Sequence, residues 1–259
     1  MKRIVVSVCS DVGNTRKNNE DNLVVNEFFN KKSSDFIEQD MKSSYPCIAG
    51  VFDGMGGTKN GERASLLCAE MFSKTEKIFK QSKNASKDLI SIYSKINKTL
   101  LKEQVETKSD LATTACVVVV TKENIYCSNV GDSRIYLFED DNMRLVSIDD
   151  NQAQLLVDSN SITAQQAKNH PSRNVLMQYM GMGLEDEGFE PEPHITVIER
   201  EKGTEYRLLI CSDGLYSFVD EDEMKKDVLD DEYNAANILV EKAIDNNSTD
   251  NVTAVVLTF

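Results

Sequence analysis

The middle of the chain carries four strand-like runs that follow one another with only short polar breaks between them. The runs are rich in β-branched and aromatic residues, and they cover residues 113–121, 125–129, 134–138 and 145–148. Parallel strands need a crossover of about a dozen or more residues, whereas antiparallel strands can be joined by a tight turn. The spacing therefore predicts an antiparallel meander and excludes a parallel βαβ sheet in this part of the chain.

Further strands and amphipathic helices surround this meander. Six more strand-like runs cover residues 4–9, 22–26, 47–52, 195–199, 206–211 and 252–258. Apolar residues recur at helical spacing over 64–79, 89–100 and 234–245, so each of these segments is expected to bury one face. Because no Pro-, Gly- or Ser-rich linker divides the chain, we expect a single domain over residues 1–259. The predicted fold class is α+β, with two antiparallel β-sheets packed as a sandwich and helices on the outer faces.

The charge balance narrows the partners that such a protein can bind. The 259 residues include 43 acidic and 29 basic side chains, which gives a formal net charge of −14. Binding to a nucleic acid or to an anionic membrane requires clustered Lys and Arg, and the sequence shows no such stripe. We therefore expect neither a nucleic acid nor a membrane as partner.

The sequence favours a cytoplasmic location. Residues 4–9 are too short and too interrupted to form a signal peptide, and the longest apolar run, 115–120, falls far below the ~18 residues of a membrane span. The six cysteines occur singly, without a C-x-x-C pair, and are expected to be buried thiols in a reducing compartment. The alternative, a thiol nucleophile, would need a nearby base, and the chain contains only His170 and His194.

Four aspartates lie next to strongly apolar strands, in turns that also carry Gly or Asn. They are Asp53, Asp132, Asp213 and Asp250. If these strand ends converge, the four carboxylates would repel one another unless cations neutralise them. Oxygen ligands without Cys or His nearby favour Mg²⁺ or Mn²⁺ over Zn²⁺. The alternative is that each aspartate is an ordinary turn residue, because Asp-Gly is a turn signal in any protein.

Six motifs extend this pattern over nearly the whole chain. They are DVGNTRKNNED at 11–21, VFDGMGG at 51–57, TTA at 113–115, GDSRIY at 131–136, SDGL at 212–215 and TDNV at 249–252. In order and approximate spacing they resemble the motifs of the metal-dependent serine/threonine phosphatases of the protein phosphatase 2C family, in the form of a bacterial-type stand-alone catalytic domain. Each motif alone is weak, but the ordered set is specific.

The resemblance implies a role for each acidic motif residue in binding Mn²⁺ or Mg²⁺. Asp53 would bridge two ions and Gly54 would contribute its backbone carbonyl. Asp213 and Asp250 would hold one of these ions. Serine/threonine phosphatase activity is the function that the resemblance implies.

The remaining site residues also follow from the resemblance. The Glu20–Asp21 pair would serve the other ion, directly or through water, and Asp132 with Asp213 matches the place where bacterial members hold a third ion. Arg16 matches the phosphate-binding arginine, and a guanidinium can donate two hydrogen bonds to phosphate oxygens. The implied reaction is the hydrolysis of phosphoserine or phosphothreonine in proteins by a hydroxide formed from water that bridges the two ions.

Two further segments bear on this interpretation. Relatives carry a flap beside the active site, which corresponds to about 152–183 here, and helical patterns occur at 152–158 and 164–170. Asp149-Asp150-Asn151 departs from the family pattern, because many relatives have an Asp-His-Ser turn at this place. Since that turn is not among the metal ligands of the family, we do not expect the departure to abolish activity.

The expected partners are phosphorylated protein substrates and a serine/threonine kinase that the enzyme opposes, and the chain is expected to be a monomer. One alternative is a phosphatase dedicated to a stress or sporulation anti-anti-sigma regulator, although such proteins often lack the arginine that Arg16 supplies. Another alternative is a catalytically inactive metal-binding interaction module. The intact set of Asp53, Asp213 and Asp250 speaks against it, because such modules tend to lose ligands.

Overall fold

Two antiparallel sheets form the centre of the molecule. The computed structural model describes residues 4–31, 37–55, 60–183 and 190–259. Within these residues, sheet A has the strand order β11 (Asn142–Leu145), β10 (Arg134–Glu139), β13 (Tyr206–Cys211), β14 (Val252–Thr258), β1 (Ile4–Asp11) and β4 (Ile37–Ser43). Sheet B has the order β12 (His194–Glu199), β9 (Asn124–Val130), β8 (Ala115–Val120), β5 (Cys47–Phe52), β2 (Asn22–Val25) and β3 (Phe28–Phe29). The short strands β6 (Gly54–Met55) and β7 (Ala112–Thr113) pair with each other.

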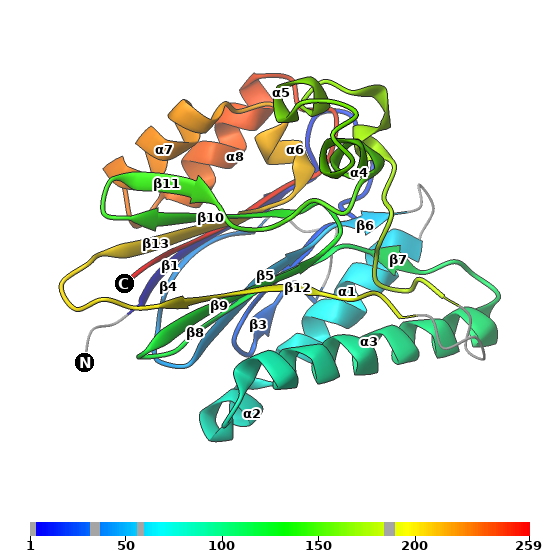
Figure 1. Ribbon diagram of the computed structural model, residues 1–259, viewed down its shortest axis with the longest axis horizontal. Coiled ribbons are helices and arrows are strands. Elements are labelled where there is room, and N and C mark those ends of the chain that lie inside the picture. The colour runs from blue at the N-terminus through cyan, green and yellow to red at the C-terminus, as the bar shows by residue number, and fades with distance from the viewer. Residues whose placement is uncertain (1–3, 32–36, 56–59, 184–189) are drawn as a thin grey trace.

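Helices cover the outer face of each sheet (Figure 1). The helices α1 (Asn60–Phe72), α2 (Glu76–Gln81) and α3 (Ala85–Thr107) lie on sheet B. The helices α6 (Asp213–Tyr216), α7 (Glu221–Asp230) and α8 (Ala235–Asp245) lie on sheet A. A group of short helices, α4 (Gln152–Asp158), α5 (Ala164–Ala167) and η1 (Pro171–Asn174), lies near one end of the sandwich beside α6.

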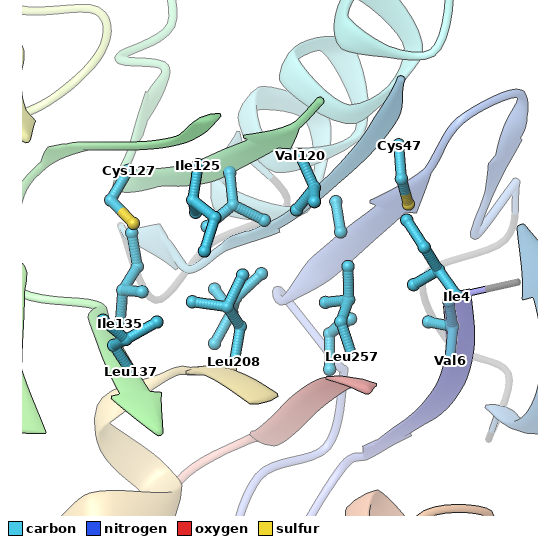
Figure 2. Close-up of a cluster of buried hydrophobic side chains, with 14 of the residues drawn as sticks. Ile4, Val6, Cys47, Val120, Ile125, Cys127, Ile135, Leu137, Leu208 and Leu257 are labelled. Carbon is cyan, nitrogen blue, oxygen red and sulfur yellow. The ribbon is translucent and has the colours of Figure 1, made fainter. Parts of the chain in front are cut away.

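Buried apolar side chains form three layers, because each sheet is covered on both faces. Along β8, Val118 and Val120 face the other sheet, whereas Val117 and Val119 face the helices of the α1–α3 layer. This alternation is what a strand with period-two side chains produces when both of its faces are buried. Figure 2 shows the layer between the sheets, where Leu208 of sheet A points toward sheet B. The predicted α+β sandwich is confirmed.

The predicted meander is wrong at its centre. Strands β9 and β10 do not pair, because β9 lies in sheet B between β8 and β12, whereas β10 lies in sheet A between β11 and β13. The chain passes from one sheet to the other at Gly131, whose positive φ of 96° turns it away from β9. The short turn after β9 therefore does not join two neighbouring strands of one sheet. Asp132 lies in this turn, where the chain crosses from the end of β9 in sheet B to the start of β10 in sheet A.

Several element boundaries also differ from the prediction. The strand predicted at 145–148 lies at Asn142–Leu145, and β4 was not predicted because its sequence IEQDMKS has no apolar run. The helix predicted over 64–79 is two helices, interrupted where the Thr75 hydroxyl donates to the carbonyl oxygen of Phe72 (2.7 Å). The segment predicted at 164–170 is helical only over Ala164–Ala167, because Pro171 begins a separate 3₁₀ turn. None of the helices in the described ranges combines the length and apolar character needed to cross a membrane.

Candidate metal centre

Strand ends from both sheets meet around one cavity of about 670 Å³. Because neighbouring strands are antiparallel, the carboxyl end of one strand lies beside the amino end of the next. Cys211 at the end of β13 thus pairs with Ala254 near the start of β14, and Val130 at the end of β9 pairs with Ala115 at the start of β8. Residues that follow or precede these ends are brought to the same edge of the sandwich.

The cavity is lined by five acidic residues from distant parts of the chain. We call them the cavity carboxylates, and they are Glu20, Asp53, Asp132, Asp213 and Asp250. Arg16 and Gly54 line the same cavity. The four aspartates that the sequence pattern singled out are therefore brought together. Of the VFDGMGG motif, Gly56 and Gly57 lie outside the described residues.

The backbone of Asp53 is held by two threonines of the TTA motif. The Asp53 amide donates to the hydroxyl oxygen of Thr114 (3.0 Å), and the Thr114 amide donates to the carbonyl oxygen of Asp53 (2.8 Å). The Thr113 hydroxyl donates to the same carbonyl (2.9 Å). The Thr114 hydroxyl also shares a hydrogen bond with the Ser133 hydroxyl (2.7 Å), so one side chain sets the position of Asp53 relative to the turn that carries Asp132.

Gly54 allows the chain to approach closely beside Asp53. A Cβ at this position would lie 2.5 Å from the carbonyl oxygen of Glu20 and 2.3 Å from that of Gly61, which no other residue type could tolerate. The Gly54 amide donates to the carbonyl oxygen of Glu20 (3.2 Å). The glycine therefore brings Glu20 next to Asp53.

Asn251 positions the loop that carries Arg16 and Glu20. Its side-chain amide donates to the carbonyl oxygens of Val12 (2.9 Å) and Asn18 (3.0 Å), and its side-chain oxygen accepts from the Glu20 amide (2.8 Å). Sequence reasoning missed this function of Asn251. The only available signal was its place directly after Asp250 in the TDNV motif.

Asp21 lies behind the cavity and does not line it. Its side chain is almost fully buried, at 1% exposure, and it accepts a hydrogen bond from the Ser212 hydroxyl (2.8 Å). Burial, together with the charges of Asp250 and Asp213, raises the pKa of Asp21 to about 7. Of the predicted Glu20–Asp21 pair, Glu20 alone reaches the cavity surface.

The cavity carboxylates hold protons more tightly than exposed carboxylates do. Burial raises the pKa of Asp213 to about 6, and the neighbouring Asp250 adds to this effect. Burial and the surrounding carboxylates also raise the pKa of Asp53 and that of Asp132 well above the ordinary value. The site therefore favours added positive charge, whether from protons or from cations.

Arg16 is the cationic group beside these carboxylates. Its Nη2 donates to Oδ2 of Asp250 (2.7 Å), and this hydrogen bond raises the pKa of the guanidinium. The Arg16 side chain remains 46% exposed, so it is accessible from the cavity mouth. The predicted phosphate-binding arginine and a predicted metal ligand are therefore direct neighbours.

The donor set fits a hard divalent cation. The cavity carboxylates offer only oxygen atoms, which Mg²⁺ and Mn²⁺ prefer over Zn²⁺. Within the described ranges, no three acidic, His or Cys side chains form a compact ligand cluster as they stand. All six cysteines are buried thiols away from the cavity lining, which removes the thiol-nucleophile alternative.

Comparison with known proteins gives this arrangement a family context. Residues 30–238 match the family model described as protein phosphatase 2C. The chain is 28% identical to the serine/threonine phosphatase stp of Listeria welshimeri, over 96% of this chain and 93% of the relative. It is 31% identical to the serine/threonine protein phosphatase PstP of Mycobacterium tuberculosis over 81% of this chain, and the match spans 40% of the length of that relative.

A solved structure is similar over the whole fold. The catalytic domain of a serine/threonine protein phosphatase PstP, in complex with two manganese ions, matches with a TM-score of 0.75 and 26% identity. The match covers 99% of this chain and 98% of that domain.

Proposed function

The chain belongs to the protein phosphatase 2C family, and we propose that it hydrolyses phosphoserine and phosphothreonine in proteins with divalent cations bound in the cavity. The observation that carries this proposal is the convergence of five carboxylates from separate strand ends beside an accessible arginine. The family is metal-dependent, and its relatives named above are serine/threonine phosphatases.

We assign the metal-binding roles as follows. Asp53 would bridge two ions, with the Gly54 carbonyl as a further ligand, and Asp213 and Asp250 would hold one of the two. This assignment is supported by the common cavity that these residues line and by the pKa values of Asp53 and Asp213, which burial and then the neighbouring carboxylates raise. The ions are Mn²⁺ or Mg²⁺, and two manganese ions are present in the related PstP structure.

The other acidic residues would act in two different ways. Glu20 would serve the second ion from the cavity surface, and Asp21 would act from behind it by orienting Ser212 and adding negative charge. Asp132 faces the cavity with Asp213 and would hold a third ion.

The reaction needs a nucleophile, a phosphate site and a neutral balance of charge. Bound divalent cations would lower the pKa of a bridging water and offset charge on the phosphoryl oxygens. The chain itself supplies Arg16, whose guanidinium can donate two hydrogen bonds to phosphate oxygens and remains charged at every working pH. Its contact with Asp250 supports this role, because the guanidinium reaches the edge of the proposed ligand set.

The setting of this activity is also part of the proposal. The substrates would be phosphorylated proteins supplied by a serine/threonine kinase, and the chain would act in the cytoplasm as a monomeric catalytic unit. Six buried thiols suit a reducing compartment. The net charge of −14 opposes a nucleic acid or an anionic membrane as partner. Segment 152–183 would act as the flap, since Asn174 and Leu176 line the cavity.

Phosphate release from a phosphothreonine peptide tests the proposal. The purified protein should release phosphate with Mn²⁺ or Mg²⁺ and not with EDTA, and Asp53→Ala and Asp213→Ala should both remove the activity. A folded protein that releases no phosphate from several phosphopeptides with either metal would contradict the proposal. That result would favour the phosphatase dedicated to one regulator protein, or the inactive metal-binding module, instead.

A further inference from the structure

The turn that departs from the family pattern contains a buried carboxylate. Asp150 is 8% exposed, and it follows Asp149 directly in the chain. Neither residue lines the cavity. A buried carboxylate is costly unless hydrogen bonds satisfy it, so its partners indicate what the residue holds in place.

Asp150 forms a reciprocal pair of hydrogen bonds with Gly131. The Gly131 amide donates to Oδ2 of Asp150 (3.0 Å), and the Asp150 amide donates to the carbonyl oxygen of Gly131 (3.1 Å). Gly131 has a φ of 96°, and a Cβ there would lie 2.7 Å from Cγ2 of Thr114. The backbone N–H and C=O of Gly131, the residue before Asp132, are therefore both held by Asp150.

The second oxygen of Asp150 binds two other parts of the fold. Oδ1 accepts from the side-chain amide of Gln178 (2.9 Å) and lies 2.8 Å from Nε2 of His194. The Met177 amide donates to the carbonyl oxygen of Asp150 (2.7 Å). Asp150 thus joins the Asp132 turn to the end of segment 152–183 and to the first residue of β12.

Asp149 supports the same turn from its other side. It forms a bidentate ion pair with Arg134 (3.1 and 2.8 Å), and this guanidinium lies over the ring of Tyr216 at 3.9 Å. The Tyr216 hydroxyl donates to the carbonyl oxygen of Asp132 (3.1 Å). The backbone around Asp132 is therefore fixed by contacts before and after it.

We propose that the Asp150–His194 pair is a positioning unit that sets the turn carrying Asp132, and thereby the affinity of the cavity for the cation that Asp132 holds. The inference rests on the proposed role of Asp132 as a ligand. His194 donates to Oδ1 and keeps the Asp150 carboxylate oriented, so that Oδ2 faces the Gly131 amide. His194 is half-buried and accessible to substitution without opening the core, since 33% of its side chain is exposed.

Mn²⁺ titration calorimetry on the whole chain tests this inference. Asp132→Asn should remove the weakest binding event. Asp150→Asn should weaken the same event by roughly 10-fold while leaving the tighter events unchanged, because removing an outer partner of a ligand costs about 10–100-fold in metal affinity. His194→Ala should weaken it less, and His194→Gln, which keeps a donor nitrogen at that position, should restore binding close to wild type.

A readout without metal separates positioning from general stability. Amide hydrogen exchange at Gly131 should be faster in Asp150→Asn and His194→Ala than in wild type, and unchanged in the control Asp158→Asn, whose carboxylate accepts from Gln154 on the surface. Thermal unfolding of each variant reports any loss of overall stability.

The outcomes distinguish the inference from the proposed function. An unchanged isotherm in Asp132→Asn would contradict the ligand role of Asp132, and the inference would fall with it. A changed isotherm in Asp132→Asn beside an unchanged one in Asp150→Asn and His194→Ala would contradict the inference alone. If Asp150→Asn weakened the affinity of every Mn²⁺ binding event equally, and His194→Gln bound Mn²⁺ no better than His194→Ala, the pair would have only a structural role. That result would contradict the inference.

Discussion

Two acidic regions of this molecule have the same residue types and opposite surroundings. The cavity carboxylates lie at strand ends, whereas the α7 acidic run, residues 220–223, begins a helix on the surface. In the run, Asp220, Glu221 and Asp222 are exposed, and Asp220 accepts a hydrogen bond from the Glu223 amide (2.9 Å) as the N-cap of α7. Negative charge at a helix N-terminus is stabilising and needs no cation.

In the cavity the same charges oppose one another. Burial and neighbouring carboxylates raise the pKa of Asp53, Asp132 and Asp213, so ionising all of them is unfavourable without added positive charge. The comparison teaches that the number of acidic residues in a stretch does not identify a metal site. The cavity carboxylates differ from the α7 acidic run in that they converge from distant strand ends, which is the feature that the proposed metal site needs.

The largest expected effect is the loss of catalysis on removing one cavity carboxylate. Asp213→Asn should lower kcat on the order of 10³-fold, the scale observed when one electrostatic stabiliser of a transition state is removed. In EDTA the same variant should be at least as stable as wild type, because a half-buried charge that its neighbours repel is gone. Phosphate release and urea unfolding measure the two effects.

The matched control for this prediction is Asp222→Asn in the α7 acidic run. It should change neither kcat nor the free energy of unfolding beyond about 0.5 kcal/mol, as is usual for an exposed substitution. If Asp213→Asn were inactive and also strongly destabilised in EDTA, Asp213 would be a structural residue of the sandwich.

This contrast also explains which parts of the molecule the sequence could predict. The strands of the core were predictable because their apolar runs are local, as along β8 and β13, and the four aspartates were noticed because each follows or precedes such a run. The destination of Asp132 was not predictable from its turn, since the change of sheet at Gly131 depends on long-range pairing of β10 with β13. The hydrogen bonds of Asp150 were not predicted either. They also depend on long-range contacts, because its partners Gly131, Gln178 and His194 come from three separate segments.

A smaller effect is expected at the cavity mouth. Arg16→Ala should raise KM for a phosphopeptide by roughly 10- to 100-fold, which corresponds to the loss of a charge-assisted hydrogen bond of about 1.5–3 kcal/mol. Mn²⁺ affinity measured without substrate should not fall. Steady-state kinetics and calorimetry give both values.

Arg63→Ala is the matched control for Arg16, because Arg63 also forms an ion pair with a carboxylate, Glu103, but lies outside the cavity lining. Its KM should equal that of wild type. An unchanged KM in Arg16→Ala would remove the phosphate-binding role.

The protein without metal should lose stability as pH rises. The folded pKa of Asp21 is about 7 and that of Asp213 about 6, both above the value of about 3.9 for an unfolded Asp. The folded protein therefore keeps protons that the unfolded chain releases, so this contribution is complete below about pH 4 and is lost as pH rises toward 7. Thermal unfolding in EDTA should show it as a lower Tm at pH 7 than at pH 5.

Asp21→Asn isolates this contribution from the other titrating groups. Between pH 5 and pH 7 the Tm of wild type should fall more than the Tm of the variant. Saturating Mn²⁺ should raise the Tm of wild type most at pH 7. A difference that is constant over this range would contradict the raised pKa of Asp21.

The smallest expected effect lies in the α7 acidic run, where the comparison predicts a cost in stability without a cost in activity. Asp220→Ala removes the hydrogen bond to the Glu223 amide and one negative charge from the helix N-terminus, so unfolding should become easier by about 1 kcal/mol. Asp220→Ser keeps an acceptor oxygen and should recover most of that loss, while kcat, KM and Mn²⁺ affinity stay at wild-type values in both variants. A lower Mn²⁺ affinity in Asp220→Ala would mean that the α7 acidic run contributes to the electrostatic potential in the cavity. The two acidic regions would then not be separate in function.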